Sequence, residues 1–243
     1  MITPGTLVGV GVGPGDPELL TLKAVRAVAG ADVVAHFAKT GNASNARAVV
    51  AQHLPPNAVE LALLYPVTTE LPASDPAYKA AIQTFFDTAA DTVAQHLMAG
   101  KNVAVLSEGD PLFFGSYMHL HIRLMKRFPT QVIPGITSMS GCWSAAGLPI
   151  VQGDDVLTVL PATLPEAELV RRFSQNEPTV VMKVGRNLPK VRRALMTAAR
   201  LHDATYIERG TLPNQHLMPL LEKPDDSAPY FSIVLVAGRW WRP

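Results

Sequence analysis

The stretch NVAVLSEGDPLFFGS, residues 102–116, decides the fold class of this 243-residue chain. Its opening run, NVAVLS, is short and largely apolar, which is typical of a strand buried on both faces of a parallel sheet. The Gly-Asp-Pro sequence at 109–111 then predicts a turn, and a helix is expected over 112–127. Ligands of open α/β sheets bind at the carboxyl ends of the strands. The stretch therefore predicts a parallel α/β sheet with a candidate site in the loop that follows this strand.

Outward from this stretch, predicted strands and helices alternate along the chain, as in α/β proteins. Strands are expected at 6–12, 32–37, 59–64, 102–107, 130–134, 155–160, 178–184, 204–208 and 230–237. Helices are expected at 17–29, 44–54, 76–99, 112–127, 137–146, 165–175 and 188–201. The run GLPIVQG, residues 147–153, contains two glycines and a proline and predicts a boundary between domains. We therefore expect two α/β domains with mostly parallel or mixed sheets, one over 1–147 and the other over 148–243.

The run VGVGVGPGDPELLT, residues 8–21, places glycine at every second position from 9 to 15. A dinucleotide fingerprint needs a third glycine at a fixed offset, and the three registers put Pro14, Asp16 or Glu18 there. A phosphate-binding P-loop is also excluded, because no Lys-Ser or Lys-Thr closes the run. The alternatives are a plain strand-to-helix turn and a glycine backbone that lines a pocket. We favour the pocket.

Composition narrows the class of protein. Net charge is +1, 48% of residues are hydrophobic, and neither half of the chain carries the basic stripe of a nucleic-acid binder. Neither an apolar run long enough for a membrane span nor a secretory signal is visible. Cys142 is the only cysteine, which excludes an intrachain disulfide and a thiolate metal cluster. We expect a cytoplasmic protein that handles small molecules, without nucleic acid, membrane or bound metal.

Three loops have related sequences. Gly-Asp-Pro occurs at 15–17 and again at 109–111, each time between a predicted strand and a predicted helix, and IPGITS at 133–138 also follows a strand. Each motif alone is ordinary turn chemistry. Together they predict three loops that converge on one edge of the first sheet and form a binding site.

The joint set VGVGPGDPELLT, SEGDPLFFGS, IPGITS, VVMKVG and YFSIVLV resembles the tetrapyrrole methylases over nearly the whole chain. This resemblance implies two α/β domains with S-adenosylmethionine folded between them, and a homodimer. Within the family, SEGDPLFFGSYMHLHIRL, VMKVGRN and YIERGT are most similar to the enzymes that methylate C20 of precorrin-2 to give precorrin-3A in cobalamin biosynthesis.

The resemblance also implies which residues contact the cofactor and the substrate. Cofactor contacts are expected at Gly109, Asp110, Pro111, Leu112, Phe113, Ser116, Thr137, Ser138, Met182, Tyr206, Ile207, Phe231 and Ser232. The substrate trough is expected to be lined by Gly11, Gly13, Pro14, Gly15 and Asp16. Glycine suits a trough, because a large flat ring comes closest to backbone without side chains.

Methyl transfer to C20 needs little from side chains beyond positioning, because the reduced tetrapyrrole is itself the carbon nucleophile. A base must then remove the C20 proton. Candidate catalytic residues are Glu108, Asp110 and Tyr117, with His119 and His36 as further candidates.

Precorrin-2 carries many carboxylates, so basic side chains are expected around its trough. The sequence offers a cluster without neighbouring acids, with a solvated helix face as the alternative and Arg47 and Lys39 as weaker candidates. The cluster comprises Arg186, Lys190, Arg192 and Arg193.

Several alternatives stay open. The substrate is precorrin-2, its cobalt-bearing form or another corrin intermediate. A Rossmann oxidoreductase is disfavoured by the failed glycine registers, and a non-catalytic tetrapyrrole-binding protein by the complete loops at 109–116 and 137–138. Besides the resemblance, Trp240 and Trp241 near the end of the chain favour a dimer, because adjacent tryptophans are costly to leave in water.

Overall fold

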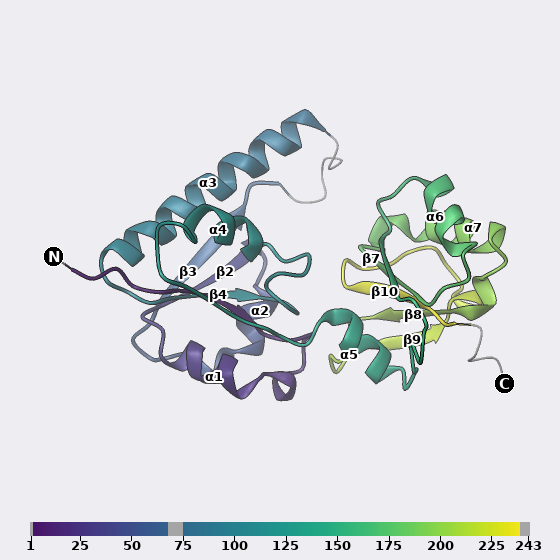
Figure 1. Ribbon diagram of the computed structural model, residues 1–243, viewed down its shortest axis with the longest axis horizontal. Helices are drawn as coiled ribbons and strands as arrows, with labels where there is room; N and C mark the ends of the chain where they lie inside the picture. Colours follow the sequence, from purple (N-terminus) through teal and green to yellow (C-terminus); the bar gives the residue numbers. More distant parts are fainter. Residues whose placement is uncertain (1, 68–74, 239–243) are drawn as a thin grey trace. The chain divides into compact units, whose positions relative to one another are not determined.

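The computed structural model describes residues 2–67 and 75–238 (Figure 1). The chain divides into two compact units, Met1–Thr137 and Ser138–Pro243. This division falls before the expected boundary after residue 147, because helix α5 (Ser138–Ala145) packs on the sheet of the second unit. Trp240 and Trp241 lie outside the described residues.

The first unit is built on a parallel sheet with the strand order β3-β2-β4-β1-β5. Its strands are β1 (Leu7–Gly11), β2 (Val33–Lys39), β3 (Val59–Tyr65), β4 (Val103–Ser107) and β5 (Thr130–Ile133). Strand β4 is buried along its whole length, as its apolar sequence predicts. Because all five strands run the same way, the loops that follow β1, β4 and β5 leave from one edge of the sheet.

Helices cover both faces of this sheet (Figure 1). They are α1 (Leu22–Ala29), α2 (Asn45–Val49), α3 (Pro76–Met98) and α4 (Tyr117–Leu124). Helices α3 and α4 pack on one face, and α1 and α2 pack on the other. Two of these helices begin at capping residues. The side chains of Thr21 and Asp75 accept hydrogen bonds from backbone amides in the first turns of α1 and α3.

The second unit has a mixed sheet with the order β6-β7-β10-β8-β9. Its strands are β6 (Thr158–Pro161), β7 (Thr179–Met182), β8 (Ala204–Glu208), β9 (His216–Pro219) and β10 (Ser232–Val236). Helices α6 (Glu166–Phe173) and α7 (Leu188–Thr197) cover one face, and α5 packs on the other. The predicted class, two α/β units with parallel and mixed sheets, is confirmed.

Short 3₁₀ helices complete the chain at Pro17–Leu19, Ala51–His53, Gly185–Asn187, Leu201–Asp203 and Leu220–Glu222. Among the described residues, no helix is long and apolar enough to cross a membrane.

Three local predictions differ from the structure. The helix expected over 112–127 begins only at Tyr117, because Phe114 has a φ of +54° and interrupts any helix before it. The helix expected over 17–29 is divided, because the backbone of Leu20 is extended between a 3₁₀ turn and α1. Strand β9 was not predicted; it is a short edge strand that ends at Pro219.

Candidate functional site

The loops after β1, β4 and β5 are joined to one another at the carboxyl edge of the first sheet. Gly13 and Gly109 form an antiparallel bridge, in which the Gly109 amide donates to the Gly13 carbonyl at 2.8 Å. Both glycines have positive φ, +79° for Gly13 and +66° for Gly109, which other residues adopt only with strain. The β1 and β4 loops therefore converge, as predicted.

Glycines 11 and 135 let the loop backbones approach still more closely. A Cβ on Gly11 would lie 2.7 Å from the Cα of Gly135 and 2.8 Å from the carbonyl oxygen of Gly109. A Cβ on Gly135 would meet the same Gly109 oxygen and, at 2.9 Å, the Cα of Gly11. The absence of a side chain at these two positions therefore allows the loops to pack against each other within the protein. The sequence did not reveal this role.

The carboxylate of Asp110 ties the β4 loop to the β5 loop. Its Oδ1 accepts a hydrogen bond from the Leu112 amide at 2.9 Å, and its Oδ2 accepts one from the Gly135 amide at 3.2 Å. Both oxygens therefore hold backbone. This use makes Asp110 a positioning residue in the described structure and disfavours it as a base.

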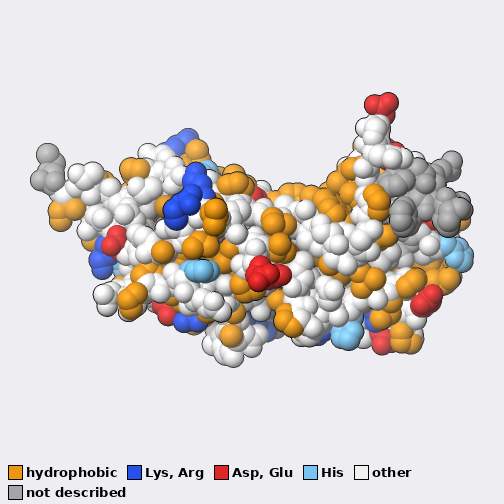
Figure 2. Space-filling view, turned by 90° about the horizontal axis from the view of Figure 1, so that it is seen from below, with side chains coloured by type: hydrophobic (Ala, Val, Ile, Leu, Met, Phe, Trp, Pro, Cys, Tyr) orange, Lys and Arg blue, Asp and Glu red, His pale blue; other side chains and the backbone are white. Residues whose placement is uncertain are grey.

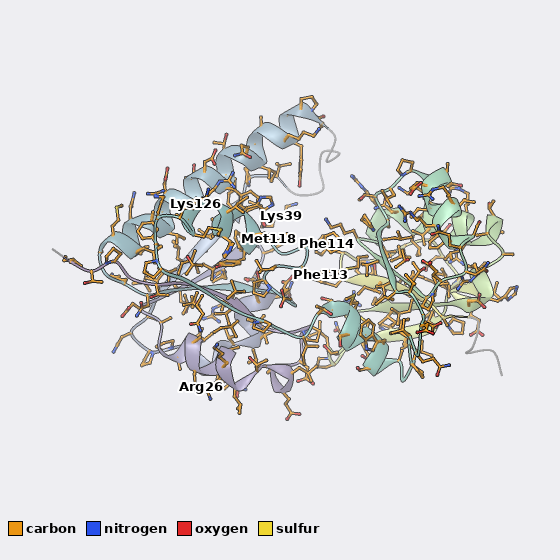
Figure 3. All side chains as sticks on the ribbon, viewed as in Figure 1. Arg26, Lys39, Phe113, Phe114, Met118 and Lys126 are labelled. Carbon is orange, nitrogen blue, oxygen red and sulfur yellow. The ribbon has the colours of Figure 1, made fainter. Side chains whose placement is uncertain are left out.

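The rest of the β4 loop presents apolar side chains. Leu112 is 48% exposed and Phe114 is 44% exposed, although both are large and hydrophobic. Figure 3 marks Phe113 and Phe114 on this loop, and their rings form an edge-to-face pair with centroids 4.9 Å apart. Phe114 is also strained by its positive φ, and such outliers cluster at functional sites. Sequence analysis had left Phe114 out of the site, although its exposure and backbone strain favour including it.

Hydroxyl groups lie at the ends of these loops. Ser116 precedes α4 and is half-buried, and its hydroxyl is hydrogen-bonded to that of Tyr65 at the end of β3. Thr137 closes the β5 loop and is half-buried, and Ser138 begins α5 in the second unit. Pro111, by contrast, is buried.

Among the candidate bases, Glu108 has the most suitable surroundings. It is exposed, and its carboxyl is hydrogen-bonded to the side chain of Asn45 and the backbone of Ala46 at the start of α2. Desolvation by nearby protein raises the pKa of this carboxyl, while the two hydrogen bonds oppose the rise. Because the residue is exposed, water limits the shift. A raised pKa brings a carboxylate closer to what a general base at neutral pH needs.

Tyr117, also predicted as a catalytic residue, lies in the core. Its ring is fully buried where a side chain on Gly9 would collide with it, and its hydroxyl is 3.1 Å from Nδ1 of His121. Burial raises the pKa of its phenol to about 12. A neutral phenol inside the core is poorly suited to accept a proton from a ligand.

The two histidine candidates differ in their surroundings. His119 stacks on Phe86, with ring centroids 4.0 Å apart. His36 is buried on β2, and its Nδ1 has no hydrogen-bond partner among the described residues. Burial lowers the pKa of both imidazoles.

The predicted trough residues follow β1. Gly11 and Gly13 are buried, whereas Pro14, Gly15 and Asp16 are half-buried. Oδ1 of Asp16 accepts a hydrogen bond from the Glu18 amide at 2.8 Å and caps the 3₁₀ turn. The part of this loop that reaches the surface is therefore its second half.

In the second unit, the predicted segments meet at one edge of the mixed sheet. Strands β7 and β8 both run antiparallel to β10, so their carboxyl ends lie beside its start. The Arg209 amide donates to the Phe231 carbonyl at 2.8 Å, and the Gly185 amide donates to the Ser232 hydroxyl at 3.4 Å. Backbone strain also gathers here. Residues with positive φ at this edge are Lys183, Gly185, Arg209 and Thr211.

The cofactor contacts predicted in the second unit do not all face the same way; they are Met182, Tyr206, Ile207, Phe231 and Ser232. Adjacent residues of a strand point to opposite faces, so Tyr206 lies in the core under α6 and α7 while Ile207 faces α5. Met182 packs on the α5 face with Ile207. Ser232 is buried beside Tyr206, and Phe231 is 38% exposed.

Two of the four residues in the basic cluster at 186–193 pair with acids distant in sequence. Arg192 pairs with Asp226 at 2.7 Å, and Arg193 pairs with Glu166 at 2.7 Å. Arg192 also donates to backbone carbonyls of the 220–225 segment and holds that segment in place. Arg192 and Arg193, which looked free of acids in the sequence, therefore have structural ion pairs. Likewise Arg47 pairs with Glu60 at 2.6 Å.

These motifs and their arrangement match one protein family. The model of the tetrapyrrole (corrin/porphyrin) methylases matches residues 6–223. The chain belongs to this family. The resemblance inferred from the sequence motifs is thereby confirmed.

Individual proteins that are similar to this chain agree with this assignment. A Precorrin-2 C(20)-methyltransferase of Sinorhizobium sp is 64% identical over 98% of both chains. A Cobalt-precorrin-2 C(20)-methyltransferase of Salmonella typhimurium is 28% identical over 97% of this chain and 98% of its own. A solved uroporphyrin-III C-methyl transferase of Thermus thermophilus, complexed with S-adenyl homocysteine, shares the fold with a TM-score of 0.67 at 23% identity; the match covers 97% of this chain and 98% of that one.

Proposed function

We propose that this chain is an S-adenosylmethionine-dependent methyltransferase that methylates C20 of precorrin-2 to give precorrin-3A. The observation that carries the proposal is the 64% identity, over 98% of both chains, to the Sinorhizobium precorrin-2 C(20)-methyltransferase. Identity at this level over the full length favours the same substrate, whereas the cobalt-precorrin-2 enzyme is only 28% identical.

The residues of the first unit suit the cofactor. A nucleoside with an amino-acid tail needs apolar cover, hydroxyls and backbone donors and acceptors. The β4 loop offers the apolar side chains of Leu112 and Phe113, and the hydroxyls of Ser116 and Thr137 lie at the loop ends. The bound cofactor in the Thermus neighbour is a product of such a reaction and supports this assignment. The second-unit contacts at Met182, Tyr206, Ile207, Phe231 and Ser232 stay predictions.

When bound, S-adenosylmethionine supplies the methyl group, and the chain has two tasks. The glycine-tied loops hold the reactants in position, which is the main contribution that a protein makes to an in-line displacement. Glu108 accepts the proton that C20 loses after methylation, because the two oxygens of Asp110 already hold backbone amides and Tyr117 is buried.

Substrate carboxylates need basic partners, and two residues of the sequence-predicted cluster, Arg192 and Arg193, are engaged in ion pairs. Lys39 ends β2 at the carboxyl edge of the first sheet and is exposed, so we propose it as one partner (Figure 3). Figure 2 shows lysine and arginine side chains at separate points of the face that it draws.

Incubation with labelled S-adenosylmethionine and a panel of tetrapyrroles tests the proposal. We expect one methyl group to be transferred to precorrin-2, at C20, and much less to the cobalt-bearing form. Preferred methylation of the cobalt form would reassign the substrate. Binding of tetrapyrrole without any transfer would favour a non-catalytic binding protein instead. A homodimer is a further prediction, which light scattering checks.

A further inference from the structure

The β4 loop is fixed at both of its ends by contacts from other strands. At its start, Asp110 is tied to the β5 loop through the Gly135 amide. At its end, the hydroxyl of Ser116 is hydrogen-bonded to the hydroxyl of Tyr65, 51 residues earlier in the chain. Between these two ties lies the strained residue Phe114, with its φ of +54°. A strained backbone persists only where its surroundings hold it.

Ser116 is placed as a helix cap but is used differently. A serine before a helix normally accepts a hydrogen bond from an amide of the first turn. Within the described part of the chain, Ser116 makes no such bond to α4. Its hydroxyl is therefore oriented by Tyr65 rather than by the helix that it precedes.

Tyr65 is itself rigidly placed. Its ring stacks on Phe37 with centroids 5.7 Å apart, lies 4.7 Å from Phe85, and meets Phe86 edge-on at 6.2 Å. These partners come from β2 and α3, so the phenol is held by two elements outside the loop. A hydroxyl on a ring packed in this way loses little further conformational freedom when it holds a partner.

The same aromatic cluster extends to α4, the helix that follows the loop. His119 stacks on Phe86 at 4.0 Å, and the Arg123 guanidinium lies 5.9 Å from the centre of the Phe86 ring. Arg123 also pairs with Asp87 at 2.8 Å. The cluster thus fixes α4 and the loop end against α3 together.

We propose that Tyr65 is a positioning residue that holds the β4 loop in its ligand-binding conformation through the Ser116 hydroxyl. The proposal rests on the proposed function, in which this loop contacts the cofactor. Tyr65 sets the position of Ser116 and of the strained backbone before it, and does not take part in the chemistry.

The variant Tyr65→Phe removes the hydroxyl and keeps the ring in its cluster. We expect the melting temperature to stay close to that of the native protein. A hydrogen bond contributes about 0.5–1.5 kcal/mol, so the dissociation constant for S-adenosylhomocysteine should rise about two- to tenfold. In the protein without ligand, hydrogen exchange of the Leu112 and Phe113 amides should become faster, because these amides are bonded inside the loop.

A double-mutant cycle separates this role from any other that Tyr65 has. If Tyr65 acts through Ser116, the Tyr65→Phe change should have no further effect on affinity or exchange in a Ser116→Ala background. Additive effects of the two changes would overturn the proposal. Tyr78→Phe, on α3 and half-buried, is the matched control and should change neither readout.

The outcomes also separate this proposal from the proposed function. If the native protein fails to bind S-adenosylhomocysteine, the proposed function is contradicted, while the exchange measurement still tests Tyr65. If the native protein binds and Tyr65→Phe binds equally well with unchanged exchange, the role of Tyr65 is refuted and the proposed function stands.

Discussion

At the scale of single residues, the chemistry of the site depends on which polar groups already have partners. Asp110 and Glu108 are two positions apart. The Asp110 carboxylate ties two loops together through the Leu112 and Gly135 amides, whereas the Glu108 carboxyl is exposed and is hydrogen-bonded to Asn45 and Ala46 at the start of α2. Sequence spacing does not distinguish them. Their surroundings do, because the Asp110 carboxylate joins two loops through backbone amides whereas Glu108 is exposed.

Glu108→Gln tests the proposed base. We expect kcat to fall about 10²-fold or more while the affinity for S-adenosylhomocysteine stays unchanged. In the native protein kcat should rise with pH as Glu108 loses its proton, at a pH above the ordinary range of a glutamate because its pKa is raised. The variant should lack this rise. Asp91→Asn, on the exposed side of α3, is the control, and a native pH profile in Glu108→Gln would exclude the role.

Cys142 offers a second test at this scale. Its thiol is buried, and burial raises its pKa to about 12, so the reactive thiolate is scarce at neutral pH. We expect a thiol reagent at pH 8 to modify the folded protein only as fast as it unfolds, and the denatured protein at once. Rapid modification of the folded protein would contradict the burial of this residue against Gly210.

At the scale of elements, the site is a set of loops that pack through glycine. The sequence predicted the strands of the first sheet, the order of the motifs and their convergence, because parallel strands bring their carboxyl ends to one edge. It did not predict that Gly11 and Gly135 serve contacts between loops, since those contacts join residues far apart in the chain. For the same reason the ion pairs of Arg192 and Arg193 were missed.

Gly11→Ala tests this packing. The new methyl group would collide with the backbone of Gly135 and Gly109, and neither neighbour is a flexible side chain. We expect a loss of stability of about 3 kcal/mol, at the upper end for overpacking, together with loss of cofactor binding. Gly41→Ala is the control, because its Cβ would meet nothing within 4 Å and only its positive φ is strained. Denaturant unfolding measures the stability of both variants. Equal stabilities of Gly11→Ala and Gly41→Ala would show that the loops tolerate a side chain at Gly11.

At the scale of the whole molecule, the chain is two units whose boundary is set by α5. The two glycines and the proline of GLPIVQG, residues 147–153, pointed to a later boundary than the division after Thr137. The reason is tertiary: Met139, Cys142 and Trp143 of α5 pack on strands of the second sheet, among them β8 and β10. The glycines and proline at 147–153 follow the end of α5 and do not mark the end of the first unit.

Two fragments distinguish the boundaries. A fragment over 138–243 keeps α5, whereas one over 148–243 exposes the apolar face formed by Val180, Ile207 and Leu235. We expect the shorter fragment to melt at a lower temperature and to bind a hydrophobic dye. Trp143→Ala in the longer fragment should give an intermediate result. Equal melting temperatures for the two fragments would show that α5 contributes nothing to the second unit.

The position of β1 in the first sheet has a consequence for how the protein is made. This strand, LVGVG, lies between β4 and β5, and Thr6 just before it is hydrogen-bonded to Asn102, 96 residues later. At about 5–20 residues per second, a ribosome needs about 5–20 s to synthesise that interval. An apolar strand with unpaired edges invites pairing with other chains. The yield of folded protein therefore depends on what shields LVGVG until its two neighbours emerge.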